Sequence, residues 1–233
     1  AGTQPVATRL QVRGDLYVLA DLDGKLAVIN VLPLEALVAG ILPSEMFASA
    51  PLEALKAQAV TARGEILAKV GRRHATEPAM LCNEQHCQVY RGLESEQPRT
   101  NQARQDTAGE IAVLGGKLVD SVYSSCCGGH TEANEAVWDQ VPADPLRDTV
   151  DGPDSPFARS LTHVRTDDDV RTLLDGPRAA TFCGMSTFNQ KADIYRWQRR
   201  FRADELNKLL AGLDVGAIVH LEVDGRGPGG RLR

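Results

Sequence analysis

The stretch from residue 51 to residue 70 constrains the fold most, because it predicts one helix whose two ends can both be located. Pro51 suits the first helical position, where a missing backbone N–H costs nothing, and Gly71 suits a left-handed C-terminal cap. Apolar residues between these ends recur at intervals of three and four, as in one stripe of a helix. They are Leu52, Leu55, Ala59, Ala62, Ile66 and Val70. The helix is also rich in alanine, so we expect a buried central helix that packs closely against another element.

A short polar break, Pro43-Ser44-Glu45-Met46, precedes this helix and carries one carboxylate. The apolar run at residues 34–42 predicts a short helix that leads to Glu45, which we therefore expect near the leading end of the central helix. Desolvation among apolar neighbours would raise the pKa of this carboxyl group, and a protonated Glu can donate to a glycosidic oxygen. The alternative is a surface carboxylate that caps the region ahead of the helix.

Two predicted β-hairpins flank the central helix, with tight turns at Asp23-Gly24 and Gly115-Gly116. Their strands are expected at residues 16–22, 25–31, 110–114 and 117–124. An exposed helix is expected at residues 99–107 and another helix at 203–210. Further strands are expected at residues 88–91, 192–201 and 217–223. A chain of 233 residues can bury a substantial core as one large domain or two small ones. We predict the α+β class: a single mixed domain over residues 1–233, with a buried central helix flanked by β-hairpins.

The composition argues against two classes of protein. A net charge of −5 without a run of Lys or Arg does not suit a nucleic-acid binder. No apolar run approaches the roughly 18–20 residues that cross a bilayer. The chain begins at Ala1 and shows no signal peptide, so we expect a mature or trimmed form from which an export signal has been removed.

Four segments carry a family resemblance. They are LPSEM followed by APLEALKAQAVTAR in 42–70, CNEQHCQVYRG at 82–92, SVYSSCCGGHTEANEAVW at 121–138 and YRWQRRFRADEL at 195–206. In this order, over about three quarters of the chain, they resemble the SpoIID/LytB domain family of bacterial cell-wall proteins. The final GRGPGGRLR is similar to the turn into the family's last strand, so we expect that strand to be truncated.

The resemblance implies a peptidoglycan lytic transglycosylase whose catalytic residue is Glu45. In such enzymes the Glu protonates the leaving oxygen and then, as a base, helps the sugar's own 6-hydroxyl close a 1,6-anhydro ring. One carboxylate can suffice for this reaction, whereas most glycoside hydrolases use two. The sequence shows no second carboxylate in an equally distinctive setting. Family members favour glycan strands whose stem peptides have been removed.

The alternative function is a non-catalytic cell-wall-binding module that stimulates an amidase, since LytB-type proteins are described as modifiers of a partner amidase. Glu45 in its PSEM context discriminates between the two, because a mere binder has no need of it. Either function implies peptidoglycan glycan strands as the partner, no nucleic acid, and an extracytoplasmic location in the periplasm or at the cell surface.

The segment from Cys82 to Cys87 brings two thiols and the imidazole of His86 together, and zinc prefers such ligands in a tetrahedron. Some family members hold zinc near the catalytic Glu through this segment, so the resemblance implies zinc bound by Cys82, His86 and Cys87. The spacing supplies at most three ligands. A Cys82–Cys87 disulfide is the rival in an oxidising compartment, and free thiols are the third alternative. Zinc or disulfide would place both cysteines close together near Glu45.

A glycine-containing loop, Ser124–Thr131, follows the second hairpin. Adjacent glycines let a backbone approach a ligand closely, so we expect this loop to line a cleft. The family motif places His130 in the groove beside the catalytic Glu. The substrate contacts that the resemblance implies are Gln88, Tyr90, Gly128, Gly129 and His130.

Cys126 and Cys127 depart from the family, which has Ser or another small residue at these positions. A thiol near His130 suggests a Cys–His nucleophile, so a cysteine peptidase is a third functional class. Adjacent cysteines on a strand point to opposite faces, so at most one can meet His130. The alternative is that both fill the wall of the cleft, one of them bonded to another cysteine. An odd total of five excludes full pairing within the chain.

Overall fold

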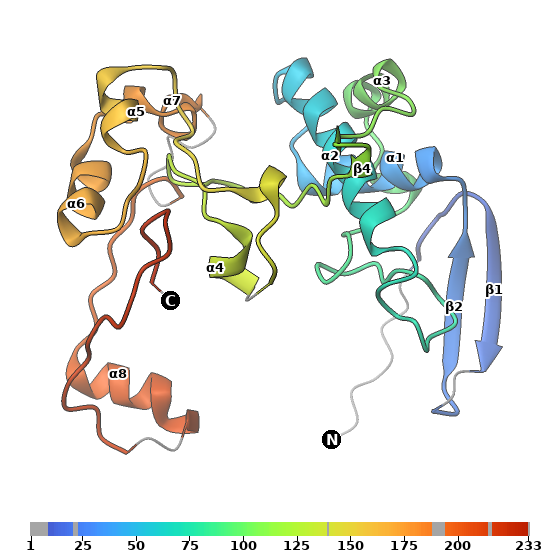
Figure 1. Ribbon diagram of the computed structural model, residues 1–233. Coiled ribbons are helices and arrows are strands. Elements are labelled where there is room, and N and C mark those ends of the chain that lie inside the picture. The colour runs from blue at the N-terminus through green and yellow to red at the C-terminus, as the bar shows by residue number, and fades with distance from the viewer. Residues whose placement is uncertain (1–8, 21–22, 139, 188–193, 214–215, 233) are drawn as a thin grey trace. The chain divides into compact units, whose positions relative to one another are not determined.

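The computed structural model describes residues 9–20, 23–138, 140–187, 194–213 and 216–232. The chain forms two compact units, Ala1–Tyr123 (unit 1) and Ser124–Arg233 (unit 2) (Figure 1). Each unit has its own cluster of buried apolar side chains. Helices combined with small antiparallel sheets confirm the predicted α+β class. That one domain extends over all of residues 1–233 stays a prediction.

Three helices form the core of unit 1, in which α2 packs against both α1 and α3. The elements of unit 1 are β1 (Asp15–Ala20), β2 (Leu26–Val31), α1 (Leu34–Glu45), α2 (Leu52–Lys69), the 3-10 helix η1 (Leu93–Ser95), α3 (Pro98–Asp106), β3 (Val113–Leu114) and β4 (Lys117–Leu118). The predicted central helix is confirmed as α2, with its apolar stripe buried at Leu55, Ala59, Ala62 and Ile66. Gly71 has the expected positive φ of 74°. The helix predicted as exposed, α3, buries Ala103 in the same core.

Helix α1 continues through the predicted polar break and ends at Glu45. Pro43 lies inside the helix and lacks the N–H of a normal helical turn. The Ser44 hydroxyl and the Met46 backbone N–H each donate to the carbonyl oxygen four residues earlier, at 3.1 and 3.0 Å. These two hydrogen bonds stabilise the last turn of α1, which follows Pro43. The prediction of a polar break at residues 43–46 is therefore wrong for residues 43–45. Glu45 is the last residue of a helix and does not lie in a loop.

A partly buried ion pair joins α1 to α2. The Arg63 side chain is 0% exposed and donates from Nε and Nη2 to the two carboxylate oxygens of Glu35, at 2.7 and 3.0 Å. Its remaining donors reach Thr107 Oγ1 at 3.2 Å and the Arg104 carbonyl at 2.9 Å, so the guanidinium is bound by α1 and by the C-terminal end of α3. Hydrogen bonding from Arg63 lowers the pKa of Glu35.

Glu35→Gln is expected to lower the free energy of unfolding at pH 7 by about 3 kcal/mol, because it leaves the Arg63 charge buried without its partner. A lowered pKa means that this stabilisation is present above the ordinary carboxyl pKa and is lost as the pH falls through the folded-state value. Denaturant titrations should therefore show the difference from wild type shrinking as the pH is lowered below about 4. Glu53→Gln removes a carboxylate whose side chain is 83% exposed on α2 and should change the stability by less than about 1 kcal/mol. Equal losses for both variants would contradict the assignment.

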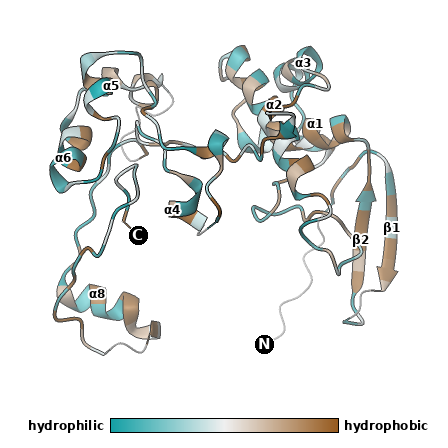
Figure 2. Cartoon of the chain, in the orientation of Figure 1, coloured by the Kyte–Doolittle hydropathy of each residue, from teal (hydrophilic) through white to brown (hydrophobic). Residues whose placement is uncertain are grey.

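Both predicted hairpins are present. Strands β1 and β2 pair antiparallel from Asp15↔Val31 to Ala20↔Leu26, with Gly24 at φ +73° in the turn. Strands β3 and β4 are two residues long, shorter than predicted. The first hairpin is rich in apolar residues, seen as brown in Figure 2, and β1 is exposed along its whole length. It flanks the helical core without contributing to it.

Unit 2 consists mainly of short helices. They are α4 (Asn134–Trp138), η2 (Asp144–Leu146), α5 (Pro156–Ser160), α6 (Asp167–Asp175), η3 (Arg178–Ala180), α7 (Phe182–Met185), α8 (Ala203–Leu210) and η5 (Ala211–Leu213). Leu161, Val164 and Leu173 form its buried cluster. Isolated antiparallel bridges join His130 to Val150 and Arg226 to Leu232. The second bridge closes the turn that was expected near the end of the sequence.

The helix predicted at 203–210 is confirmed as α8, but three predicted strands are wrong. Residues 88–91, 194–201 and 217–223 contain no strand, and the start of the second prediction, 192–193, lies outside the described residues. Alternating apolar residues become a strand only where another strand pairs with them, and the sheets of the described chain are the two hairpins alone. In those same residues, every helix is too short or too polar to cross a membrane.

Candidate functional site

Glu45 lies at the C-terminal end of α1 and is partly exposed. Its Oε1 accepts a long hydrogen bond, 3.4 Å, from the backbone N–H of Val89. The expected apolar surroundings are only half present, because Leu42 is buried whereas Phe47 is 75% exposed. Glu45 is thus a solvent-accessible carboxylate beside the residues that follow Cys87.

A chain of polar side chains connects this region to α2. The Tyr123 hydroxyl donates to Gln88 Oε1 at 2.8 Å, and Gln88 Nε2 donates to Glu65 Oε2 at 2.5 Å. Glu65 also pairs with Lys69 one turn later on α2, and the Lys69 ammonium donates to the Cys87 carbonyl. Gln88 is 3% exposed, with both ends of its amide bound to neighbouring side chains. It therefore bridges two parts of unit 1, and its predicted contact with substrate stays a prediction.

Glu65 is a second carboxyl group at this site, which sequence reasoning missed. Burial raises its pKa against the opposing effect of Lys69, and the nearby charges of Asp120 and Glu45 raise it further. Burial and the charges of Glu45 and Glu65 likewise raise the pKa of Tyr123, which keeps its phenol protonated. The structure thus gives a second carboxyl group a distinctive setting that the sequence did not show. The sequence did offer one signal for Glu65. Glu65 and Lys69 are four residues apart on the predicted helix, beside its apolar stripe, and this spacing indicates an ion pair at the edge of the core.

Tyr90 packs into the helical core. Its ring lies against Gly40 of α1, where an added Cβ would be 2.4 Å from Tyr90 Cε2. The ring belongs to the partly buried set around the core of unit 1, and burial raises the pKa of its hydroxyl. This packing accounts for an aromatic residue at position 90 without a ligand, so the contact of Tyr90 with substrate stays a prediction.

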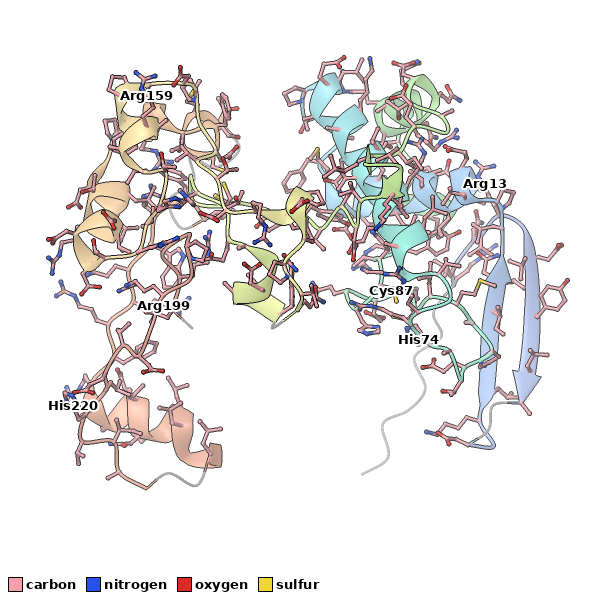
Figure 3. The ribbon with its side chains drawn as sticks, viewed as in Figure 1. Arg13, His74, Cys87, Arg159, Arg199 and His220 are labelled. Carbon is pink, nitrogen blue, oxygen red and sulfur yellow. The ribbon has the colours of Figure 1, made fainter. Side chains whose placement is uncertain are left out.

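Four possible metal ligands, the His/Cys cluster, converge in the loop after α2. One donor atom from each of His74, Cys82, His86 and Cys87 lies within 4.8 Å of all the others, and Figure 3 labels His74 and Cys87 there. Sulfur-to-nitrogen distances are 3.3 Å for Cys87–His74, 3.6 Å for Cys87–His86 and 3.7 Å for Cys82–His86. A tetrahedral zinc ion with ordinary bond lengths requires about 3.6 Å between such atoms. The donor set and its spacing therefore fit zinc.

The sequence identified three of these four residues. Cys82 and Cys87 lie close together as predicted, and they are not joined by a disulfide. His74 was missed as a ligand because it lies in a loop before the motif. Its Nδ1 is 2.7 Å from Glu77 Oε1, which orients Nε2 toward Cys87, and a carboxylate behind a His is a common support for a metal ligand.

The two thiols of the cluster differ in how readily they ionise. Burial opposes ionisation of Cys82, but hydrogen bonds from the Glu84 backbone, His86 and Cys87 lower the pKa of the thiol to about 6. Burial raises the pKa of Cys87, so the pair retains one proton near neutral pH. The thiolate is the form that binds metal.

The cluster and the carboxylate belong to one continuous piece of chain. Cys87 supplies a sulfur donor, Gln88 bridges Tyr123 to Glu65, and Val89 donates its N–H toward Glu45. An ion at the His/Cys cluster would therefore fix the segment that contacts Glu45.

The remaining predicted site residues belong to unit 2. His130 is 1% exposed, and its ring nitrogens lie 2.8 Å from the Thr131 carbonyl and 2.9 Å from the Leu161 carbonyl. The ring is thus bound to the backbone of its own unit. Gly129 has φ +96°, and a Cβ there would be 2.6 Å from Thr181 Cγ2, so packing accounts for this glycine. Substrate contacts by Gly128, Gly129 and His130 stay predictions.

A Cys–His nucleophile is not assembled, because both ring nitrogens of His130 face carbonyl oxygens while the Cys127 thiol faces Asp151 and Cys183. Cys127 and Gly128 line a cavity of about 300 Å³ within unit 2. That this loop lines a substrate cleft with Glu45 stays a prediction.

Unit 1 thus presents an accessible carboxylate beside a buried polar network and a four-donor His/Cys cluster. Residues 22–113 match the model of the SpoIID family, described as stage II sporulation protein. This confirms the predicted family for the segment that holds Glu45, Glu65 and the whole His/Cys cluster. The later two of the four resembling segments lie outside this match.

Three relatives have similar sequences. Stage II sporulation protein D of Bacillus subtilis is 31% identical over 46% of this chain and 35% of its own length. The amidase enhancer of the same organism is 41% identical over 42% of this chain and 13% of its own length. The uncharacterized protein BHWA1_00569 of Brachyspira hyodysenteriae is 40% identical over 48% of this chain and 30% of its own length. The chain thus spans about a third or less of the length of these relatives.

Proposed function

We propose that this chain is a peptidoglycan lytic transglycosylase that cleaves glycan strands with Glu45 as its acid and base. The observation that carries the proposal is the position of Glu45, which is accessible at the end of α1 beside the Val89 N–H and the buried network around Glu65. The SpoIID match over residues 22–113 includes Glu45, Glu65 and Val89. Strands already freed of stem peptides are the proposed substrate.

In the proposed reaction, the Glu45 carboxyl first gives its proton to the glycosidic oxygen as the bond from that oxygen to the anomeric carbon breaks. The resulting carboxylate then takes the proton of the sugar's 6-hydroxyl while that oxygen bonds to the anomeric carbon. Glu45 is thereby restored, and no water is consumed. Because Glu65 is buried and bound to Lys69 and Gln88, it acts as a positioning residue that holds Gln88 rather than as the acid.

We further propose zinc at the His/Cys cluster, held by His74, Cys82, His86 and Cys87. Four protein donors fill a tetrahedron, so the ion would be structural and supply rigidity, without an open position for chemistry. A structural ion is consistent with the hydrogen bond from the Lys69 ammonium to the Cys87 carbonyl, which connects the same loop to α2.

The second candidate function is a cell-wall-binding module that stimulates an amidase. The observation that favours it is the 41% identity to the Bacillus subtilis amidase enhancer over 99 residues. Both candidates have peptidoglycan as the partner and act outside the cytoplasm, in the periplasm or at the cell surface.

The products of peptide-free glycan strands test the proposal. With the purified chain in water labelled with heavy oxygen, mass spectrometry should detect 1,6-anhydro-ended sugars without the label. Reducing ends that carry heavy oxygen would instead mean hydrolysis. Intact strands, together with faster release of stem peptides by an added cell-wall amidase, would establish the second candidate function.

A further inference from the structure

Unit 2 contains a second group of possible metal ligands, which the proposed function does not use. Cys127 Sγ and Cys183 Sγ are 3.4 Å apart, and they lie 3.1 and 3.3 Å from the same oxygen, Asp151 Oδ2. All three donor atoms lie within 4.8 Å of one another. We call these three residues the thiol–carboxylate cluster.

Backbone hydrogen bonds hold its three segments together. The Asp151 N–H donates to the Gly129 carbonyl at 3.0 Å, and the Phe182 N–H donates to the Asp151 carbonyl at 2.8 Å. These bonds join the backbone of Asp151 to Gly129, two residues after Cys127, and to Phe182, the residue before Cys183, although the three segments are far apart in sequence. The cluster is therefore built by the fold of unit 2 rather than by a local motif.

We propose that Cys127, Asp151 and Cys183 form a second metal site, which binds Zn²⁺ or a similar thiophilic divalent cation. A tetrahedral zinc ion requires about 3.8 Å between two sulfur ligands and about 3.5 Å between a sulfur and a carboxylate oxygen. The three observed distances are each within a few tenths of an ångström of these values. Small outward shifts of the side chains would complete the ligand geometry.

One further contact favours a metal over a disulfide. Asp151 faces both sulfurs, where it adds a ligand to a cation but contributes nothing to a disulfide, whose sulfurs lie about 2 Å apart. Cys127 also lines the cavity of about 300 Å³. Three protein ligands would leave the fourth position of a zinc tetrahedron to water.

Metal titration of the reduced, metal-free chain tests the proposal. Zinc content would be measured by mass spectrometry, and Co²⁺ would be used as a probe whose thiolate charge-transfer band reports sulfur ligands. We expect two ions per wild-type chain. Cys183→Ser should lose the ion of unit 2 and keep that of the His/Cys cluster, whereas Cys82→Ser should do the reverse. This pairing separates the new site from the zinc proposed with the function.

Two variants guard against misfolding as the cause. Asp151→Asn keeps the side chain's size and should weaken the second ion by more than the roughly 10–100-fold typical of an outer-shell partner, with unchanged circular dichroism. His220→Ala removes an exposed possible ligand of unit 2 that lies outside the cluster, and it should keep both ions. A Cys82→Ser chain that binds no Co²⁺ through thiolates would overturn the proposal. So would a Cys127–Cys183 disulfide found by peptide mapping of the protein as purified.

Discussion

Glu45→Gln is expected to lower the rate of glycan-strand cleavage by about 10⁴-fold, at the top of the range for general acid–base catalysis. An amide cannot deliver a proton to the leaving oxygen, and this one group serves both steps of the proposed reaction. Gln is nearly isosteric with Glu, and its amide oxygen can still accept the Val89 N–H. Folding and glycan binding should therefore be almost unchanged, as checked by thermal unfolding and by co-sedimentation with purified strands.

Glu53→Gln is a suitable control, since it makes the same change at a carboxylate that is 83% exposed on α2. It should cleave like the wild type. If Glu45→Gln keeps more than a few per cent of the wild-type rate, Glu45 is not the sole acid, and Glu65 becomes the group to test. If the wild type never cleaves but still accelerates an amidase, the binding-module function is correct.

The helical part of unit 1 could be predicted because its signals are local. The interval of three and four residues located α2, and Pro51 and Gly71 located its ends. Pro43 misled the prediction for α1, because a proline near the end of a helix is tolerated when neighbouring bonds carry the last turn. The three strand predictions were wrong because their signals are not local. A strand depends on a partner strand that its own sequence does not specify.

The residues of the candidate site were likewise predicted only where they lie close together in the sequence. Cys82, His86 and Cys87 were found because they are close in sequence, whereas His74 reaches them only through the turn of the loop after α2. Glu65 was missed because its importance comes from burial and from Lys69, Gln88 and Glu45 around it. The thiol–carboxylate cluster could not be predicted, because Asp151 resembles any other acidic residue until the fold brings it between two thiols.

His74→Ala is expected to reduce zinc binding at the His/Cys cluster and, with it, the ordering of residues 82–89. Structural zinc sites contribute about 10–16 kcal/mol of binding free energy in small zinc-dependent peptides. In unit 1 the helical core remains without the ion, so we expect local opening of the loop rather than global unfolding. The Val89 N–H and the Gln88 bridge would then lose their fixed positions near Glu45, and cleavage should fall by at least about tenfold.

Amide hydrogen exchange distinguishes this effect from the loss of the acid. In His74→Ala the amides of residues 82–89 should exchange faster, whereas in Glu45→Gln they should remain protected although cleavage is lost. His220→Ala replaces an exposed His of unit 2 and should change neither the zinc content nor the exchange. Added zinc should partly restore both protection and activity to His74→Ala, because three of the four donors remain. If cleavage falls while exchange at 82–89 stays slow, the ion does not act by holding this loop beside Glu45, and His74 has another function.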